Sequence, residues 1–208
     1  MGKSIITGVI ALILLISLML IGITVASIIT GENTGTTTEE NYDQMTEEVI
    51  DEISTYIQIK DQKGKYYEIN GKQKIEKIAL WISPLVTQEI NVSQLTIQLN
   101  NGETVMFLMY NGNAENLESN SIFGHPIWNN MDGGNFGFIS IIDLDGSLVD
   151  YDTINDCSDN AYVVFKLPSD MTMLKNEKLI VTLFPSTGIT RTTILEAPLP
   201  IKTVVTFE

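Results

Sequence analysis

Four aspartates that lie close together in the chain have the chemistry to bind a metal ion. Asp143, Asp145, Asp150 and Asp152 follow an apolar run, and Asp145 precedes a glycine, as is typical of a turn. Carboxylates two residues apart on a turn can converge on one Ca²⁺, which takes about 6–8 oxygen ligands. The spacing lacks the terminal glutamate of a helix–loop–helix calcium loop. Solvated turn residues are therefore the simpler interpretation, and a Ca²⁺ site is the second.

Catalytic chemistry has little support in the sequence. The chain contains one histidine, His125, and one cysteine, Cys157, and neither lies in a recognisable nucleophile motif. Nucleophilic catalysis by Ser or Cys needs an adjacent base and a group that orients this base. The glycine-rich stretch 132–137 lacks the lysine and the following helix of a phosphate-binding loop. We therefore expect no enzyme, and no cofactor beyond the Ca²⁺ considered above.

Asn91 begins the triplet Asn91-Val92-Ser93, which is an acceptor sequence for N-linked glycosylation. The triplet stands where we expect an exposed turn before a strand. Such triplets are frequent by chance, so the motif gains meaning only if the protein is extracellular. Asn155 begins the rarer variant that ends in cysteine, and we discount it. Asn91 is therefore the candidate glycosylation site.

The charge of the chain is strongly negative and unevenly distributed. The formal net charge is −14, and no cluster of Lys or Arg is available to bind phosphates, so we expect no nucleic-acid partner. Residues 4–29 carry no charge at all, and eight acidic residues then follow before Lys60. With a single cysteine no disulfide can form within the chain, so packing must stabilise the fold.

The stretch 4–29 is long enough to cross a membrane as a helix. Seventeen of its 26 residues are Ile, Leu, Val or Met, and at about 1.5 Å per residue it spans roughly 39 Å. A cleaved signal peptide has a shorter apolar core, although Val25-Ala26-Ser27 resembles a cleavage site. A single-pass anchor fits the hydropathy alone. In every case lipid or sister helices must cover these side chains.

A second helix, amphipathic in pattern, is predicted over 36–59. Its apolar residues recur at intervals of three and four, and its first turns are threonine-rich and acidic, as suits a helix N-terminus. Gly31 and Gly35 would loosen the join to the first helix. A simple membrane anchor has no need of a second helix with its own apolar face, whereas a bundle of identical helices can bury both 4–29 and the apolar face of 36–59. The expected assembly positions are Ile5, Ile6, Val9, Ile10, Ile13, Leu14, Tyr42, Met45, Val49, Ile53 and Tyr56.

After Lys60 the apolar period changes from helical to alternating, which predicts an all-β sandwich. Asn-Gly pairs at 70–71 and 101–102 indicate hairpin turns. The Gly/Asn-rich stretch 111–137 is predicted as a long surface loop that contacts either a neighbouring subunit or the surroundings. About nine strands are expected, at 66–69, 75–83, 95–99, 104–110, 138–144, 162–167, 179–184, 192–195 and 203–207.

Several segments together resemble the archaellins, the subunits of the archaeal swimming filament. The segment SIITGVI at 4–10, together with the apolar run that follows it, is similar to the mature N-terminus of that family. IEKIALWISP at 75–84 and INVSQLTIQL at 90–99 are similar to its first core strands. FISIID at 138–143 with Asp145-Gly146, and the late Pro185, Gly188 and Pro198, fit as well. The resemblance covers most of the chain.

The resemblance implies an α+β fold with two parts. Residues 1–59 would form a long hydrophobic helix of the type IV pilin kind, for the filament core or the membrane. Residues 60–208 would form an extracellular, immunoglobulin-like β-sandwich. The protein would be a membrane-inserted precursor that polymerises with itself or with other archaellins into the extracellular archaellum filament.

Two alternatives stay open. A minor archaellum component or an adhesive type IV-like pilin would share the same plan of helix and sandwich. A membrane-anchored extracellular binding module or enzyme would instead be a stable monomer with a ligand. The amphipathic stretch 36–59 favours the polymer-forming interpretations, because it offers a second surface for burial.

Overall fold

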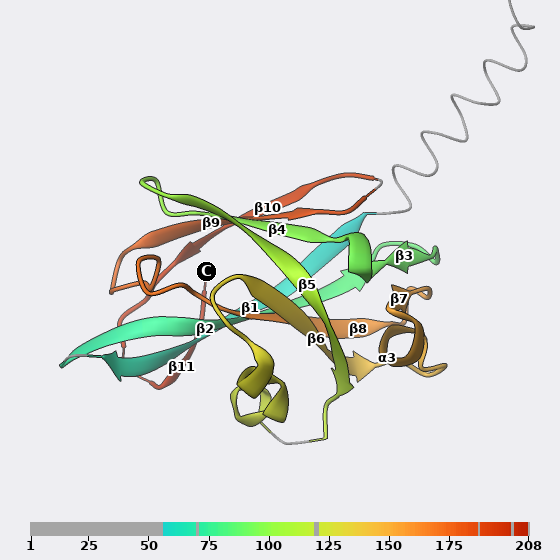
Figure 1. Cartoon of the computed structure of the whole chain (residues 1–208), viewed down its shortest axis with the longest axis horizontal. Coiled ribbons are helices and arrows are strands. Elements are labelled where there is room, and N and C mark those ends of the chain that lie inside the picture. Colours follow the sequence, from blue (N-terminus) through green and yellow to red (C-terminus); the bar gives the residue numbers. More distant parts are fainter. Residues whose placement is uncertain (1–55, 70, 119–120, 187, 201, 208) are drawn as a thin grey trace, which may run out of the picture. The chain divides into compact units, whose positions relative to one another are not determined.

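The computed structural model describes residues 56–207, apart from 70, 119–120, 187 and 201, and apart from the side chain of Ile69 (Figure 1). Within these residues no helix is long and apolar enough to cross a membrane. The predicted helix over 4–29 and most of the one over 36–59 lie outside the described residues. The same holds for the assembly positions Ile5, Ile6, Val9, Ile10, Ile13, Leu14, Tyr42, Met45, Val49 and Ile53.

The C-terminal end of the predicted amphipathic helix is wrong. Strand β1 begins at Ile57 and runs to Ile69, and Tyr56 immediately before it is not helical. Ile57 pairs with Pro84 of strand β2 (Lys72–Pro84), and its side chain is buried in the main core. Pairing with a neighbouring strand therefore overrides the helical spacing of these apolar residues.

Nine strands form one hydrogen-bonded sheet, in the order β10-β9-β4-β5-β6-β8-β2-β1-β11, and two short strands, β3 and β7, form a second. Neighbours are antiparallel except for β5 and β6, which are parallel. The strands not yet bounded are β3 (Ile90–Asn91), β4 (Thr96–Asn100), β5 (Val105–Asn116), β6 (Asn135–Ile142), β7 (Thr153–Ile154), β8 (Asn160–Lys166), β9 (Lys178–Phe184), β10 (Arg191–Glu196) and β11 (Val204–Thr206).

The β prediction is confirmed in its main lines. Each of the nine predicted strands overlaps an observed one, and only the two-residue strands β3 and β7 have no predicted counterpart. Gly102 follows Asn101 with a φ of 90°, a left-handed conformation that glycine adopts without strain. A short helix, α3 (Ser147–Tyr151), interrupts the strands and was not predicted.

The main core lies between two layers of the curled sheet. In Figure 1, β9, β10 and β4 lie in the upper layer, β2, β8 and β6 lie in the lower one, and β5 crosses between them. Alternate residues of these strands point inward, so the apolar side chains of both layers meet. Ile97 of β4, Val181 of β9 and Phe165 of β8 are fully buried in this cluster.

A second, smaller core covers the outer face of β6, β8 and β2. The stretch 111–137, predicted as a surface loop, instead continues β5 and then forms the 3₁₀ helices η2 (Ile122–Gly124) and η3 (Pro126–Asn130). Its apolar residues are buried, because they pack on the sheet: Phe123, Ile127, Trp128 and Met131 contact a cluster with Ala79, Ile139, Tyr162 and Val164. The loop prediction missed this packing.

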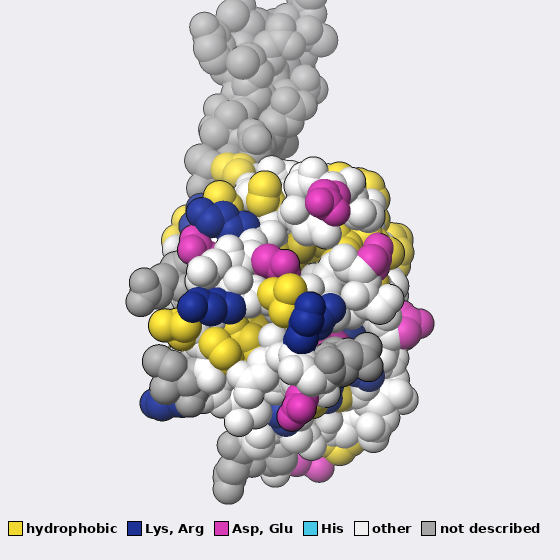
Figure 2. Space-filling model, turned by 90° about the vertical axis from the view of Figure 1, so that its left-hand side faces the viewer, with side chains coloured by type: hydrophobic (Ala, Val, Ile, Leu, Met, Phe, Trp, Pro, Cys, Tyr) yellow, Lys and Arg dark blue, Asp and Glu magenta, His cyan; other side chains and the backbone are white. Residues whose placement is uncertain are grey.

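The surface of the domain carries mixed charge. Figure 2 views the left-hand end of Figure 1, where Lys and Arg side chains lie close to exposed apolar ones and to acidic ones. The negative net charge of the chain is therefore not spread as a uniform acidic surface over the described domain.

Candidate functional site

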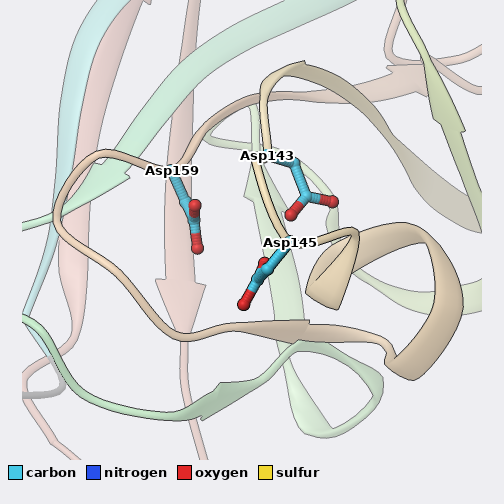
Figure 3. Close-up of side chains that lie close together, drawn as sticks. All are labelled: Asp143, Asp145 and Asp159. Carbon is cyan, nitrogen blue, oxygen red and sulfur yellow. The ribbon is translucent and has the colours of Figure 1, made fainter.

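Three aspartates from two turns form an acidic cluster with the geometry to hold a metal ion (Figure 3). Asp143 and Asp145 follow β6, and Asp159 immediately precedes β8. One carboxylate oxygen from each lies within 4.8 Å of the others. Antiparallel pairing of β6 with β8 brings the two turns together, because it aligns the end of one strand with the start of the next.

Hydrogen bonds from the two turns already engage these carboxylates. Asp143 accepts from the Leu148 backbone N–H at 3.1 Å. Asp145 accepts from Asn155 Nδ2 at 2.8 Å and from the Ser147 N–H at 3.1 Å. These donors stabilise the ionised form, so they lower the pKa of Asp145 to about 2.

Asp159 has the opposite electrostatic character. Its side chain is only 3% exposed, and it accepts from the backbone N–H groups of Asn155 and Asp156, each at 3.0 Å. Burial raises the pKa of Asp159, and the nearby charges of Asp143 and Asp145 act in the same direction. The cluster thus combines two outer carboxylates with one inner carboxylate that resists ionisation.

The predicted set of calcium ligands is only partly brought together. Asp143 and Asp145 share the cluster, whereas Asp150 and Asp152 do not belong to it. Asp152 instead accepts a hydrogen bond from Tyr110, and Asp150 is exposed on α3. Asp159, which the sequence reasoning missed, is far along the chain, and no local spacing could have indicated it. Ca²⁺ binding here stays a prediction.

Asn91 lies at an exposed position, as the glycosylation triplet requires. It ends the short strand β3, which pairs with β7, and it caps the 3₁₀ helix η1 (Val92–Gln94). Its Oδ1 accepts from the Ser93 N–H at 2.9 Å and from Ser93 Oγ at 2.5 Å. The two polar residues of the triplet therefore contact each other on the surface.

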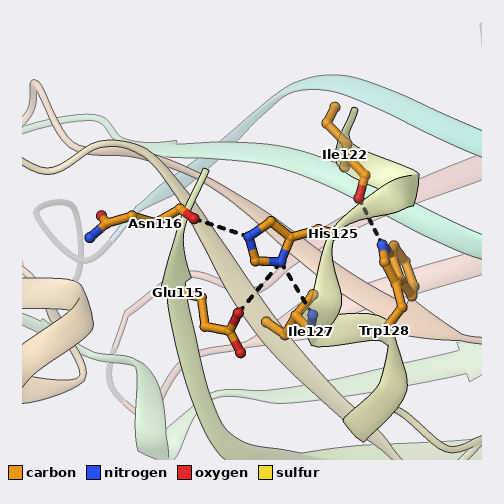
Figure 4. Close-up of polar contacts among 6 residues, drawn as sticks. All are labelled: Glu115, Asn116, Ile122, His125, Ile127 and Trp128. Carbon is orange, nitrogen blue, oxygen red and sulfur yellow. Dashed lines mark hydrogen bonds and ion pairs between the residues drawn. The ribbon is translucent and has the colours of Figure 1, made fainter. Parts of the chain in front are cut away.

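His125 is engaged by neighbouring groups at both ring nitrogens (Figure 4). Its side chain is buried, and Nε2 lies 3.0 Å from the Asn116 carbonyl oxygen while Nδ1 accepts from the Ile127 N–H at 3.2 Å. Glu115 Oε2 lies 3.6 Å from Nδ1. Both ring nitrogens are thus engaged in holding η3 against β5. Cys157 is exposed in the turn before β8.

The outward face of β5 exposes a row of large apolar side chains. Val105, Phe107 and Met109 alternate along the strand and are 51%, 56% and 57% exposed. Their neighbours across the sheet on β4 are the uncharged Asn100, Gln98 and Thr96. Exposed apolar rows of this kind are typical of surfaces that another protein covers.

Comparison with known proteins places the chain in one family. The sequence model of the archaeal-type flagellin family matches residues 6–194. Flagellin B3 of Methanocaldococcus jannaschii is 30% identical over 146 residues, which are 68% of this chain and 65% of that protein. The chain thus spans about two thirds of the length of this curated relative.

Two solved structures share the fold. The crystal structure of archaeal flagellin FlaB1 from Methanocaldococcus jannaschii matches with a TM-score of 0.64 and 20% identity, over 73% of this chain and 95% of that chain. A chain from the archaeal flagellum of Methanospirillum hungatei strain JF1 matches with a TM-score of 0.53 and 10% identity, over 97% and 99%. At such identities the likeness shows a common fold.

Proposed function

The chain belongs to the archaeal-type flagellin family, and we propose that it is a structural subunit of the archaellum, the swimming filament of archaea. The observation that carries this proposal is the family match over 6–194, which includes both the uncharged stretch and the β domain. The subunit acts by assembly and catalyses no reaction. The buried, fully engaged His125 supports this view.

The N-terminal stretch supplies the filament core. Its seventeen large apolar side chains, at about 1.5–3 kcal/mol each, correspond to at most roughly 25–50 kcal/mol of burial per subunit. Lipid covers them in the membrane-inserted precursor, and helices of other subunits cover them in the polymer. The assembly segment ends near Tyr56, and the outer immunoglobulin-like domain begins with β1.

The β domain forms the outer sheath. It is extracellular, and its partners are other copies of the chain or other archaellins. The row Val105, Phe107 and Met109 supports contacts between subunits, because a monomer gains nothing from exposing three large apolar side chains side by side. The exposed Asn91 triplet and the aspartate cluster supply candidate positions for a glycan and for Ca²⁺ on this outer surface.

Isolation of the native surface structures tests the function. Filaments sheared from cells are imaged, and their protein is identified by mass spectrometry. We expect thin helical filaments made mainly of this chain, with an N-terminus at or near Ser4. If the filaments lack the chain and it stays in the membrane fraction as a monomer, the proposal is wrong. A small fraction of the chain within filaments of another subunit would identify a minor component.

A further inference from the structure

The outer face of β1, β2 and β8 carries a group of lysines, which we call the lysine face. Lys63, Lys65 and Lys77 lie on adjacent strands of this face, and aromatic rings lie between them. Lys60 and Lys166 complete the group. A concentration of positive charge on one face is unexpected in a chain whose net charge is −14.

Three of these lysines form a straight row across the sheet. Lys65 is the direct partner of Lys77 in the β1–β2 ladder, and Lys77 is the direct partner of Lys166 in the β2–β8 ladder. Adjacent strands are about 4.8 Å apart, so each ammonium group faces a like charge. Like charges directly opposite each other destabilise a sheet. The row is therefore unfavourable for the isolated domain.

The described residues do little to neutralise the row. Their ion pairs join Lys63 to Asp61, Lys178 to Glu196 and His125 to Glu115, and none involves a lysine of the row. Burial lowers the pKa of Lys77, and the charges of Lys166 and Lys65 lower it further, against the opposing effect of Glu76. Among the described residues, the row thus has no carboxylate in ion-pair contact.

Aromatic rings hold two of these lysines in place. Lys65 Nζ and Lys77 Nζ lie 5.1 and 5.5 Å from the centre of the same ring, Tyr67. Lys77 Nζ also lies 4.8 Å from the ring centre of Trp128. Cation–π contacts of this kind orient an ammonium group without neutralising it. The lysines are therefore ordered in advance for an anionic partner.

The chain itself contains a matching anionic segment. Residues 32–52 hold eight carboxylates, and no Lys or Arg lies between positions 4 and 59. Two copies of a chain with net charge −14 repel each other unless regions of opposite sign come into contact. The lysine face and the acidic segment provide that complementarity.

We propose that the lysine face binds the acidic segment 32–52 of a second copy of this chain. This inference rests on the proposed filament function and specifies one contact within the polymer. The contact pairs the row Lys65, Lys77 and Lys166 with carboxylates of the neighbour. It removes the like-charge repulsion of the row upon assembly, so that the row favours the polymer over the monomer.

The attachment point of the segment favours a neighbour over the chain's own segment. The carbonyl oxygen of Tyr56 accepts from the Leu85 N–H at 3.0 Å, and the guanidinium of Arg191 lies 5.9 Å from the ring centre of Tyr56. Lys65 lies nine residues further along β1, about 30 Å away at the rise of a strand. The row therefore lies about 30 Å from the point at which the chain's own segment joins the domain.

Zero-length cross-linking of intact filaments tests this contact. A carbodiimide joins ammonium groups only to carboxylates in direct contact, and gel electrophoresis then separates cross-linked dimers from monomers. We expect the dimer band to contain peptides that join Lys65, Lys77 or Lys166 to the segment 32–52. Cross-links of these lysines that occur only within the monomer band, or only to carboxylates of 60–208, would overturn the inference.

A neutralising variant provides a second readout with a matched control. Lys65→Gln, Lys77→Gln and Lys166→Gln are combined in one full-length chain, and Lys175→Gln, Lys178→Gln and Lys202→Gln in another of equal net charge. We expect about a tenfold lower filament yield for the lysine-face variant, from the loss of three partly screened ion pairs, and a near-normal yield for the control.

Equal yields from the two variants would contradict the contact. For the lysine-face variant, the amount of folded chain in the membrane fraction distinguishes a lost contact from a folding defect. We expect this amount to be unchanged, because glutamine removes the like-charge repulsion within the monomer. The unmodified chain decides the underlying function separately: if it forms no filaments at all, the proposed subunit function fails, whereas filaments without these cross-links refute only the contact.

Discussion

The hydroxyl of Tyr110 donates a 2.5 Å hydrogen bond to Oδ1 of Asp152, 42 positions further along the chain. Tyr110 lies on β5, where its ring packs against Phe136 and Phe138. Asp152 caps the C-terminus of α3 in a left-handed conformation, and its carbonyl oxygen accepts from the Val92 N–H at 2.9 Å. The bond therefore ties β5 to the turn that positions both β7 and η1.

Removal of this hydroxyl should destabilise the domain. We expect Tyr110→Phe to lower the free energy of unfolding by about 1–3 kcal/mol, since Asp152 loses a partner while the ring packing stays. Chemical denaturation of the full-length chain in detergent measures the change. Tyr151→Phe is the matched control, because Tyr151 is 75% exposed. An effect of equal size in both variants would contradict the importance of this hydrogen bond.

Alkaline pH should weaken the fold through the same residue. Burial, and then the hydrogen bond and the charge of Asp152, raise the pKa of Tyr110 above its usual value of 10.0. The protonated phenol is thus favoured in the folded state, and its contribution is complete below pH 10 and is lost as pH rises towards the folded pKa. We expect wild-type stability to fall above pH 10 more steeply than that of Tyr110→Phe; parallel curves would refute this.

Acid should act on the turn that holds Asp145. Its pKa is about 2 in the folded protein against 3.8 as reference, so its stabilising effect is present above pH 3.8 and is lost as pH falls through 2. We expect Asp145→Asn to be less stable than wild type at neutral pH, with the difference vanishing near pH 2. The raised pKa of Asp159 makes stability change with pH in the opposite direction. Asp159 is present in both proteins, so the comparison between them isolates the effect of Asp145. A difference independent of pH would exclude this mechanism.

The buried histidine should matter for stability. His125→Ala leaves the Asn116 carbonyl and the Ile127 N–H without their partner and opens a cavity beside η3. We expect a loss of about 2–4 kcal/mol in the free energy of unfolding. Asn129→Ala, on the exposed side of the same 3₁₀ helix, is the control and should change stability little. Thermal unfolding followed by near-UV circular dichroism distinguishes the two.

A glycan at Asn91 is expected in the native filament. The intact mass of the isolated subunit should exceed that of the polypeptide, and the excess should disappear in Ser93→Ala, which destroys the acceptor triplet while keeping Asn91. Val92→Ile leaves the triplet intact and should keep the excess mass. A native subunit with the mass of the bare polypeptide would rule out the modification.

Local sequence patterns determined most of the β architecture. Alternation of apolar residues indicated which face of each strand is buried, as Leu95, Ile97 and Leu99 illustrate, because the side chains of a strand point to opposite faces in turn. The Asn101-Gly102 pair identified a hairpin, because glycine adopts its left-handed conformation easily. The uncharged stretch 4–29, with the residues of the family resemblance, was sufficient to point to a filament subunit.

Tertiary structure decided what depends on pairing between distant residues. The helical spacing of apolar residues up to Ile59 gave a wrong prediction, because pairing with β2 places Ile57 in a strand, where its side chain is buried in the core. The polar composition of 111–137 also gave a wrong prediction, because its few apolar and aromatic side chains pack on the sheet and are buried. Asp159 joins Asp145, and Lys65, Lys77 and Lys166 align, only through strand register. Register is fixed by the packing of the whole core, so no local spacing encodes these contacts.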